Sequence, residues 1–245
     1  MSIADFTAGT WLGRLSRYPL RVLPPTLTVP ILRGPLRGNK WVVGSQRHAF
    51  WLGIYEPHMQ SLIAREVKAG SVFYDIGANV GFYSLLAAKL VGDGKVLAFE
   101  PWSANLAHLR RHLSLNRARN VEVMELAVSD EVGSAFFQPE ATGAMGRLLE
   151  QGSVRVTTTT LDAMLHDNSA PPPHYIKMDI EGAEAKALLG GQACFRTHKP
   201  VLFLATHGRD IREQCFEILR SFNYEWQTVG TGSQERAEIF AQPRD

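Results

Sequence analysis

The stretch Val72–Ser84, VFYDIGANVGFYS, decides the fold. Its apolar run suits a buried strand that ends at Gly77, and the residues that follow favour a helix. Glu100 stands at the end of the next apolar run. A strand, a small-residue turn, a helix and an acid roughly 20 residues further on are how a doubly wound sheet holds a nucleoside-bearing cofactor. The stretch therefore predicts an α/β domain with a cofactor site at this turn.

The residues of the turn argue against a dinucleotide. A pyrophosphate site has the pattern Gly-x-Gly-x-x-Gly, whose later glycines allow the backbone to approach the ligand and to pack closely. Counted from Gly77, those two positions hold Asn79 and Phe82. The alternative of a nicotinamide-dependent oxidoreductase is therefore disfavoured, and S-adenosylmethionine fits better.

Each part of S-adenosylmethionine has a candidate partner in the sequence. We expect its ammonium beside Asp75 and the turn carbonyls, and its carboxylate at the helix N-terminus formed by Gly81–Ser84. Glu100 would accept hydrogen bonds from both ribose hydroxyls. The adenine is expected near the backbone N–H of Val128 and the side chain of Asp130, although Asp130 suits a simple turn equally well.

A second motif, Tyr175–Glu184 (YIKMDIEGAE), is rich in ionisable residues. Strand alternation turns Lys177 and Asp179 to the same side, and Asp179 falls at a strand's carboxyl end beside the cofactor. Lys177 would pair with Asp179 or Glu181, or hold a substrate oxygen. Glu181 and Glu184 fall on a first helical turn, where the dipole alone favours acids, and for Glu184 this is the preferred interpretation.

His207 ends the next apolar strand pattern. A histidine is well suited to take a proton from a hydroxyl near neutral pH, and the alternative is a packing or helix-capping role. Asp179, Glu181 and His207 are also residue types that bind Mg or Mn, so a divalent metal is conceivable, but we expect none.

From residue 71 the chain alternates between strand and helix patterns, which predicts a mostly parallel sheet with helices on both faces. The expected strands are 72–76, 95–100, 121–127, 174–179 and 200–206. The expected helices are 80–91, 103–117, 182–190 and 209–222. Two antiparallel pairs are expected as well, 135–138 with 154–158 and a closing hairpin of 224–229 with 237–240.

Residues 1–70 are predicted to be a basic extension in front of a cofactor domain formed by residues 71–245. The extension has nine Lys and Arg against three acids, or +6, and the remainder has 17 against 21, or −4. We expect it to act as a lid, to contact substrate or to join two copies in a homodimer, unless it only packs on the body. Its expected elements are a short amphipathic helix at 11–18, strands at 41–44 and 50–52, and a helix at 57–69.

Composition narrows the class of protein. The 245 residues are 45% hydrophobic and 20% charged, with a net charge of +2, which is typical of a globular protein and gives no case for nucleic-acid binding. We see neither a membrane span nor a signal peptide, and the two cysteines make no disulfide framework. A cytoplasmic protein is therefore expected.

Taken together, the motifs resemble the FkbM family of S-adenosylmethionine-dependent methyltransferases. The matching segments are Asp75–Ser84, Phe99–Pro101, Asn116, Thr160–Asp162, Ile176–Glu184 and His207. The resemblance implies a seven-stranded, Rossmann-like class I methyltransferase sheet. It also implies O-methylation of a hydroxyl on a sugar, glycan or natural product.

The resemblance assigns roles to individual residues. On cofactor positions it places Asp75, Gly77, Asn79, Gly81, Ser84 and Glu100. On active-site positions it places Asp179, Glu181 and His207, and it brings Tyr55 and Glu56 to the border of the cofactor. One position departs, because Ala205 stands where the family often has Glu. This departure implies a different substrate or activity, or a member that binds S-adenosylmethionine without catalysis.

The sequence therefore predicts a methyltransferase that acts on a small-molecule or glycan hydroxyl and releases S-adenosylhomocysteine. The hydroxyl would be held in line with the sulfonium methyl mostly by positioning, and His207, Asp179 or Glu181 would accept its proton. Acceptor contacts are expected from residues 131–160 and from the N-terminal segment.

Overall fold

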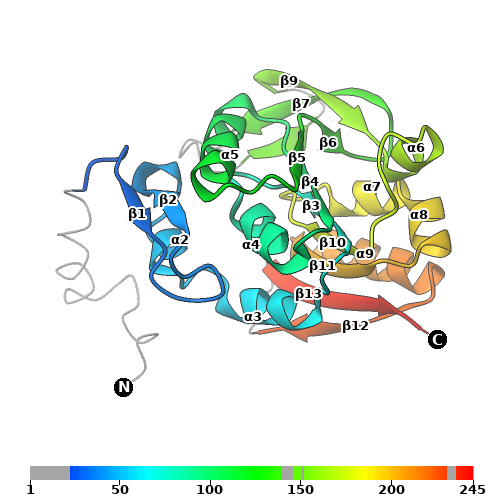
Figure 1. Ribbon diagram of the computed structural model, residues 1–245. Coiled ribbons are helices and arrows are strands. Elements are labelled where there is room, and N and C mark those ends of the chain that lie inside the picture. The colour runs from blue at the N-terminus through cyan, green and yellow to red at the C-terminus, as the bar shows by residue number, and fades with distance from the viewer. Residues whose placement is uncertain (1–22, 140–145, 150–151, 231–235, 245) are drawn as a thin grey trace.

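A central sheet with helices on both sides forms the body of the molecule in the computed structural model, which describes residues 23–139, 146–149, 152–230 and 236–244 (Figure 1). The sheet has seven strands in the order β12-β13-β11-β10-β3-β4-β5. Their bounds are β3 Val72–Ile76, β4 Lys95–Phe99, β5 Val121–Met124, β10 Tyr175–Met178, β11 Val201–His207, β12 Tyr224–Val229 and β13 Arg236–Pro243. Strand β13 is antiparallel to both of its neighbours, and the other pairs are parallel. The predicted seven-stranded sheet with its antiparallel C-terminal hairpin is therefore confirmed.

Successive residues of β3 point into two separate hydrophobic clusters. Phe73 belongs to the cluster on the face that is covered by α3 (Pro57–Glu66), α4 (Phe82–Val91) and α5 (Ser103–Asn116). Tyr74 belongs to the cluster on the opposite face. The helices of that face are α6 Leu161–His166, α7 Glu184–Leu189, α8 Gln192–Thr197 and α9 Arg209–Ser221. Because both faces are covered, the strands between them read as nearly continuous apolar runs.

A smaller sheet follows the third strand of the body. Its order is β6-β9-β7-β8, with bounds β6 Ala127–Val128, β7 Gly133–Pro139, β8 Gly146–Leu149 and β9 Val154–Thr159. The antiparallel pairing of β7 with β9 confirms the predicted pair. The single strand expected at 121–127 is wrong, because the backbone leaves the central sheet after Met124 and Ala127 then pairs with β9.

The segment before α3 contains strands β1 (Thr28–Pro30) and β2 (Lys40–Val42), which pair antiparallel, and then short helices η2 (Val43–Ser45) and α2 (Ala49–Leu52). The strand expected at 50–52 is therefore wrong. Gly53 adopts a left-handed φ of 72°, and its N–H bonds to carbonyls of the preceding turn, which closes α2 as a helix. Helix α3 ends three residues earlier than expected. The helix expected at 11–18 lies outside the described residues.

A buried histidine attaches this segment to the body. His112 of α5 stacks on Trp41 of β2 with ring centroids 3.9 Å apart. Its Nε2 accepts the N–H of Val42 at 3.1 Å, and its Nδ1 lies 2.7 Å from the carbonyl of Val80 in the turn after β3. The ring therefore donates at one nitrogen and accepts at the other, as a neutral imidazole does. Burial lowers the pKa of His112 to about 4, which is consistent with this neutral form.

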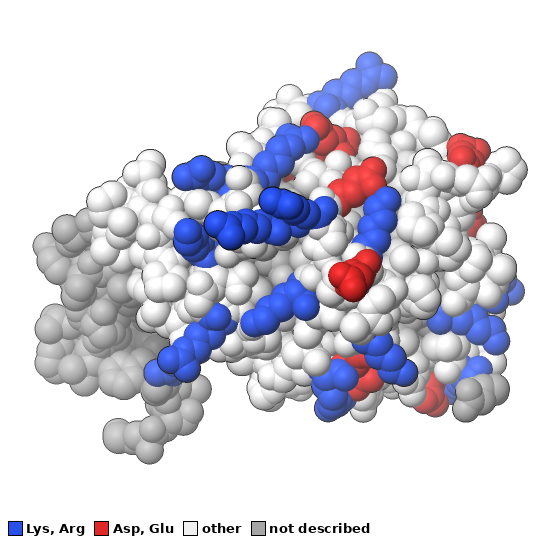
Figure 2. Space-filling model, viewed as in Figure 1, with Lys and Arg blue, Asp and Glu red and all other residues white. Residues whose placement is uncertain are grey.

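Lys, Arg, Asp and Glu side chains are spread over the face of the molecule that Figure 2 shows. No helix of the described residues combines the length and the apolar character that a membrane-spanning helix needs.

Candidate active site

A pocket lies at the carboxyl ends of β3, β4 and β10. The residues predicted from sequence that line it are Tyr55, Gly77, Asn79, Glu100, Val128, Lys177, Asp179 and Glu181. The predicted residues that lie outside its lining are Glu56, Asp75, Gly81, Ser84, Asp130 and His207. Of these residues outside the lining, Glu56 and His207 contact side chains that do line the pocket.

The turn after β3 needs its glycine. Gly77 has a φ of 84°, and a Cβ at this position would lie 2.1 Å from the carbonyl oxygen of Asp179. The N–H groups of Gly77 and Ala78 both bond to the carbonyl of Phe99 on the next strand, at 3.0 and 2.9 Å. The turn is therefore held between two neighbouring strands, with room for backbone only.

Asp75 lies behind the turn rather than in the pocket wall. It is 2% exposed, and its Oδ2 accepts the hydroxyl of Ser84 from the first turn of α4 at 2.6 Å. Burial raises the pKa of Asp75 to about 6, against the opposing effects of Ser84 and Lys177. In this position Asp75 fixes the start of α4 against the end of β3.

Glu100 closes the other side of the turn. One carboxylate oxygen accepts the N–H of Asn79 at 2.8 Å, and the other accepts the N–H of Trp102 at 2.9 Å. The side chain is almost fully buried, and burial raises its pKa to about 7. A carboxylate held in this way at a strand end is oriented to accept further hydrogen bonds from hydroxyl groups in the pocket.

Of the two residues expected near the adenine, only one lines the pocket. Val128 lies in the pocket wall, whereas Asp130 is exposed and accepts the hydroxyl of Ser129 at 2.9 Å. Asp130 does not line the pocket, and its contact with the adenine stays a prediction.

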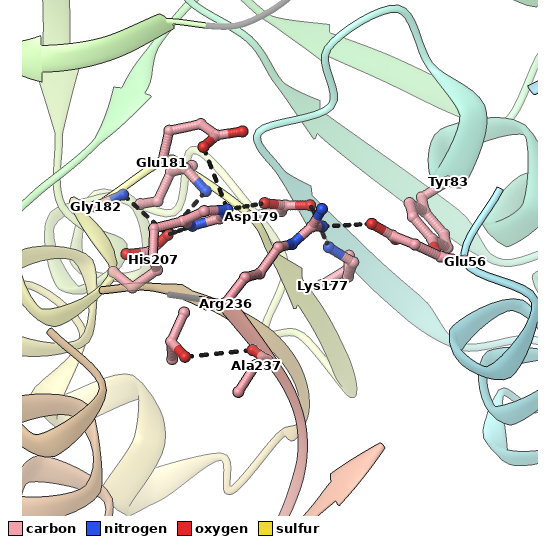
Figure 3. A network of polar contacts seen from close by, with 12 residues as sticks. Glu56, Tyr83, Lys177, Asp179, Glu181, Gly182, His207, Arg236 and Ala237 are labelled. Atoms are coloured by element: carbon pink, nitrogen blue, oxygen red, sulfur yellow. Dashed lines mark hydrogen bonds and ion pairs between the residues drawn. The ribbon is translucent and has the colours of Figure 1, made fainter. Parts of the chain in front are cut away.

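A network of charged side chains surrounds Asp179, next to the turn (Figure 3). Lys177 Nζ and Arg236 Nη2 each lie 3.2 Å from the same oxygen of Asp179, Oδ2. Arg236 also pairs with Glu56, whose second oxygen accepts the hydroxyl of Tyr83 at 2.6 Å. Burial favours neutral Asp179, but Lys177 and Arg236 outweigh it and keep the pKa of Asp179 well below its usual range.

Three carboxylates surround His207. Its Nδ1 lies 2.7 Å from Glu184, and its Nε2 lies 3.2 Å from Glu181 and 3.5 Å from Asp179. Burial acts to lower the pKa of His207, but the hydrogen bond to Glu184 and the neighbouring charges outweigh it, so the pKa is raised. His207 is thus held toward its protonated form, which donates hydrogen bonds rather than accepting a proton.

Glu181 differs from its neighbours in conformation and in acidity. It has a φ of 52°, a left-handed value that is uncommon outside glycine, and it lines the pocket. Burial raises its pKa, and the charge of Asp179 adds to this effect against that of His207. Non-glycine residues held in this region concentrate at functional sites.

Ligand atoms of Asp179, Glu181 and His207 lie within 4.8 Å of one another, a spacing that a divalent cation could bridge. Lys177 and Arg236 already neutralise Asp179, so the cluster has its countercharge from side chains. The expectation of no metal stays a prediction.

Several pocket residues were missed by reasoning from sequence. Gln46, Arg47 and Phe50 come from the segment before α3, and Arg236 comes from the last strand. Gln46 donates to the side chain of Asn79 at 2.9 Å. For Arg236 a signal was present, because pairing the expected hairpin with the preceding strand sets it opposite His207. For Gln46 we find no such signal.

The seven-stranded sheet with a pocket at its carboxyl edge defines a class I, Rossmann-like methyltransferase fold. A SAM-dependent O-methyltransferase from Thermotoga maritima superposes with a TM-score of 0.53 at 13% identity, over 75% of this chain and 63% of that one. At this identity the similarity shows the fold alone.

Residues 75–230 match the methyltransferase FkbM domain, and the chain belongs to this family. It is 26% identical over 131 residues to hexuronic acid methyltransferase AglP of Haloferax volcanii, which is 53% of each protein. It is 38% identical over 79 residues to 31-O-demethyl-FK506 methyltransferase FkbM of Streptomyces tacrolimicus, 31% of this chain and 30% of that protein. The chain thus spans about half, or less, of the curated relatives it matches.

Proposed function

We propose that this chain uses S-adenosylmethionine to methylate a hydroxyl group of a sugar or a related natural product. The observation that carries the proposal is that one pocket joins the turn at Gly77 and the buried Glu100 to the charged network around Asp179. The first set of groups suits a nucleoside, and the second suits a hydroxyl-rich acceptor.

The cofactor would be held by the turn and the two strands beside it. Glu100 would accept hydrogen bonds from the ribose hydroxyls, and Asn79 and Gly77 would border the amino-acid part. Val128 would border the adenine. When bound, S-adenosylmethionine supplies the methyl group, because its C–S bond breaks as the new C–O bond forms and S-adenosylhomocysteine remains.

A sugar acceptor is supported by the aromatic and charged pocket residues near Asp179. Tyr55, Tyr83 and Phe50 provide aromatic surface, and Asp179, Glu181, Lys177 and Arg236 provide donors and acceptors for neighbouring hydroxyls. The relative AglP is a hexuronic acid methyltransferase by name, which agrees with a sugar ring in this position.

The roles of the acids follow from their protonation. Asp179 is a weak base, because two cations lower its pKa, and it would orient the acceptor. Glu181 lines the pocket with a raised pKa, so it is the better acceptor for the proton that the hydroxyl loses. His207 would hold Glu181 and Asp179 in place, since its Nε2 faces both.

Calorimetry tests the cofactor first. S-adenosylhomocysteine should bind and NADH should not, and Glu100→Gln should weaken binding about 10- to 100-fold, the value of hydrogen bonds to a charged group. Glu122→Gln, on the neighbouring strand β5 and exposed, is the matched control. Binding of NADH, or an unchanged affinity in Glu100→Gln, would contradict the cofactor assignment.

The acceptor and the base are tested by release of S-adenosylhomocysteine over a panel of glycosides, uronic acid glycosides and polyketides. We expect turnover with a member of the sugar group. Glu181→Gln should then lower kcat by about 100-fold or more, as the loss of a general base does, with cofactor affinity unchanged. His207→Asn should lower kcat less, and the reverse order would return the role of base to His207.

A further inference from the structure

Glu56 and Arg236 join the two ends of the described chain at the pocket. They are 180 positions apart, and both lie outside the residues 75–230 that match the family domain. Glu56 precedes α3, and Arg236 is the first residue of β13, opposite His207 of β11. The contact therefore adds to the site two side chains from outside the matched residues.

Glu56 is the enclosed member of the pair, whereas the side chain of Arg236 is 38% exposed. The side chain of Glu56 is 10% exposed, and its two oxygens are used by Arg236 and by the hydroxyl of Tyr83. Glu56 also has a left-handed φ of 41°, uncommon for a glutamate, at the start of α3. A residue kept in such a conformation needs the surrounding contacts to hold it there.

Arg236 connects this pair to Asp179. Both Lys177 and Arg236 contact Asp179 through Oδ2, at 3.2 Å each. The other oxygen, Oδ1, is buried and accepts no hydrogen bond from any residue within the described ranges, and His207 Nε2 lies 3.5 Å from it. A buried carboxylate oxygen without a donor calls for an explanation, and a ligand hydroxyl supplies one.

We propose that Arg236, braced by Glu56, is a positioning residue that fixes the carboxylate of Asp179 so that Oδ1 receives a hydrogen bond from the acceptor. The proposal rests on the proposed function for the identity of that acceptor. The orientation of the carboxylate itself is a property of the protein alone, and it can be tested without any acceptor.

Crystal structures of Arg236→Met and of wild type provide this test. With one cation left on Oδ2, the carboxylate of Asp179 should turn, so that Oδ1 no longer faces His207 and both oxygens share Lys177. An Asp179 that keeps its wild-type orientation in Arg236→Met overturns the proposal. Arg110→Met is the matched control, since Arg110 pairs with Glu125 on an exposed part of the surface.

Kinetics provide the second measurement, with p-nitrophenyl glucuronide as the probe and its parent glucoside beside it. Arg236→Met should lower kcat/KM for a probe that wild type methylates by about 10-fold or more, as loss of a charged hydrogen-bonding partner does. The affinity for S-adenosylhomocysteine should stay within about twofold. Arg236→Lys, which keeps the charge in a different shape, should recover part of the loss, and Glu56→Gln should cost less than Arg236→Met.

A kcat/KM in Arg236→Met that equals the Arg110→Met control overturns the proposal in the same way as an unmoved carboxylate. Failure of the proposed function has a different signature. If the proposed function is wrong, wild type does not bind S-adenosylhomocysteine. The Arg236→Met crystal still reports whether the carboxylate of Asp179 turns, because that observation needs neither cofactor nor acceptor.

Discussion

Two groups of residues at the site differ in how far apart along the chain their polar partners lie: those around the turn, proposed to hold the cofactor (the cofactor end), and those around Asp179, proposed to meet the acceptor (the acceptor end). At the cofactor end, Asp75 and Ser84 are nine positions apart, and Asn79 and Glu100 are 21 apart. At the acceptor end, Arg236 joins Asp179 across 57 positions and Glu56 across 180. The first end is one strand, one turn and the next strand, and the second is assembled from both ends of the described chain.

This difference also follows the bounds of the family match. The cofactor end lies almost wholly within the residues that match the family domain, whereas Glu56, Gln46, Arg47 and Arg236 lie outside them. The proposed cofactor needs a fixed local geometry at the turn. Side chains from the flanking segments can change the proposed acceptor site without disturbing that turn.

The largest effect on cofactor affinity is expected at Gly77, where the backbone of the turn is closely packed. In Gly77→Ala the added methyl would meet the carbonyl oxygen of Asp179 at 2.1 Å, and φ is left-handed. We expect the affinity for S-adenosylhomocysteine in calorimetry to fall roughly 100-fold or more, because close-packed backbone cannot yield that far.

Gly70→Ala is the control for this prediction. Gly70 has a similar φ of 78°, but apart from its two chain neighbours no described residue has an atom within 4 Å of its Cβ position. Gly70→Ala should lower the free energy of unfolding by about 1–2 kcal/mol, the cost of a left-handed alanine, and leave the affinity for S-adenosylhomocysteine unchanged. If both variants bind alike, close backbone approach does not govern the cofactor end.

The contrast between local and distant partners also explains what the sequence could predict. The strand, turn and helix at Gly77 carry their own signals, and Glu100 follows by topology alone. The strand predicted at 50–52 is part of the helix Ala49–Leu52, because an apolar run of this length is too short to show a helical or a strand period. The left-handed Gly53, which closes the helix, is the local feature that favours it. The pairing of Glu56 with Arg236 depends on the docking of both flanking segments, which no local pattern encodes.

A medium effect is expected at the contact that joins the N-terminal segment to the turn. Because burial holds the pKa of His112 near 4 when folded, the unfolded chain binds the extra proton between about pH 6.5 and pH 4. Stability from neutral His112 is therefore complete above pH 6.5 and is lost as the pH falls toward 4, by up to about 3 kcal/mol. Urea unfolding of wild type and His112→Asn should show a gap that narrows from pH 7.5 to pH 4.5.

Wild type has to be compared with His112→Asn at each pH, because Glu100 and Asp75 change the free energy of unfolding with pH in the opposite direction. Their pKa values are raised by burial, so their contribution to stability falls as pH rises, in both proteins equally. Exposed His198 at the end of α8 is the control, and His198→Asn should track wild type throughout. A gap that stays constant with pH would mean that His112 does not join the segment to the turn as a neutral ring.

The smallest effect tests whether the N-terminal segment reaches the cofactor at all. Gln46 Nε2 donates to Asn79 Oδ1 at 2.9 Å, and the N–H of Asn79 in turn bonds to Glu100. Gln46→Ala removes one neutral hydrogen bond from this chain, worth about 1 kcal/mol, so the affinity for S-adenosylhomocysteine should fall about 3- to 10-fold. Gln242→Ala, which removes an exposed contact to Glu225 at the far hairpin, should leave the affinity unchanged. Equal affinities for Gln46→Ala and Gln242→Ala would confine the segment to the acceptor end, and the division between the two ends would then be complete.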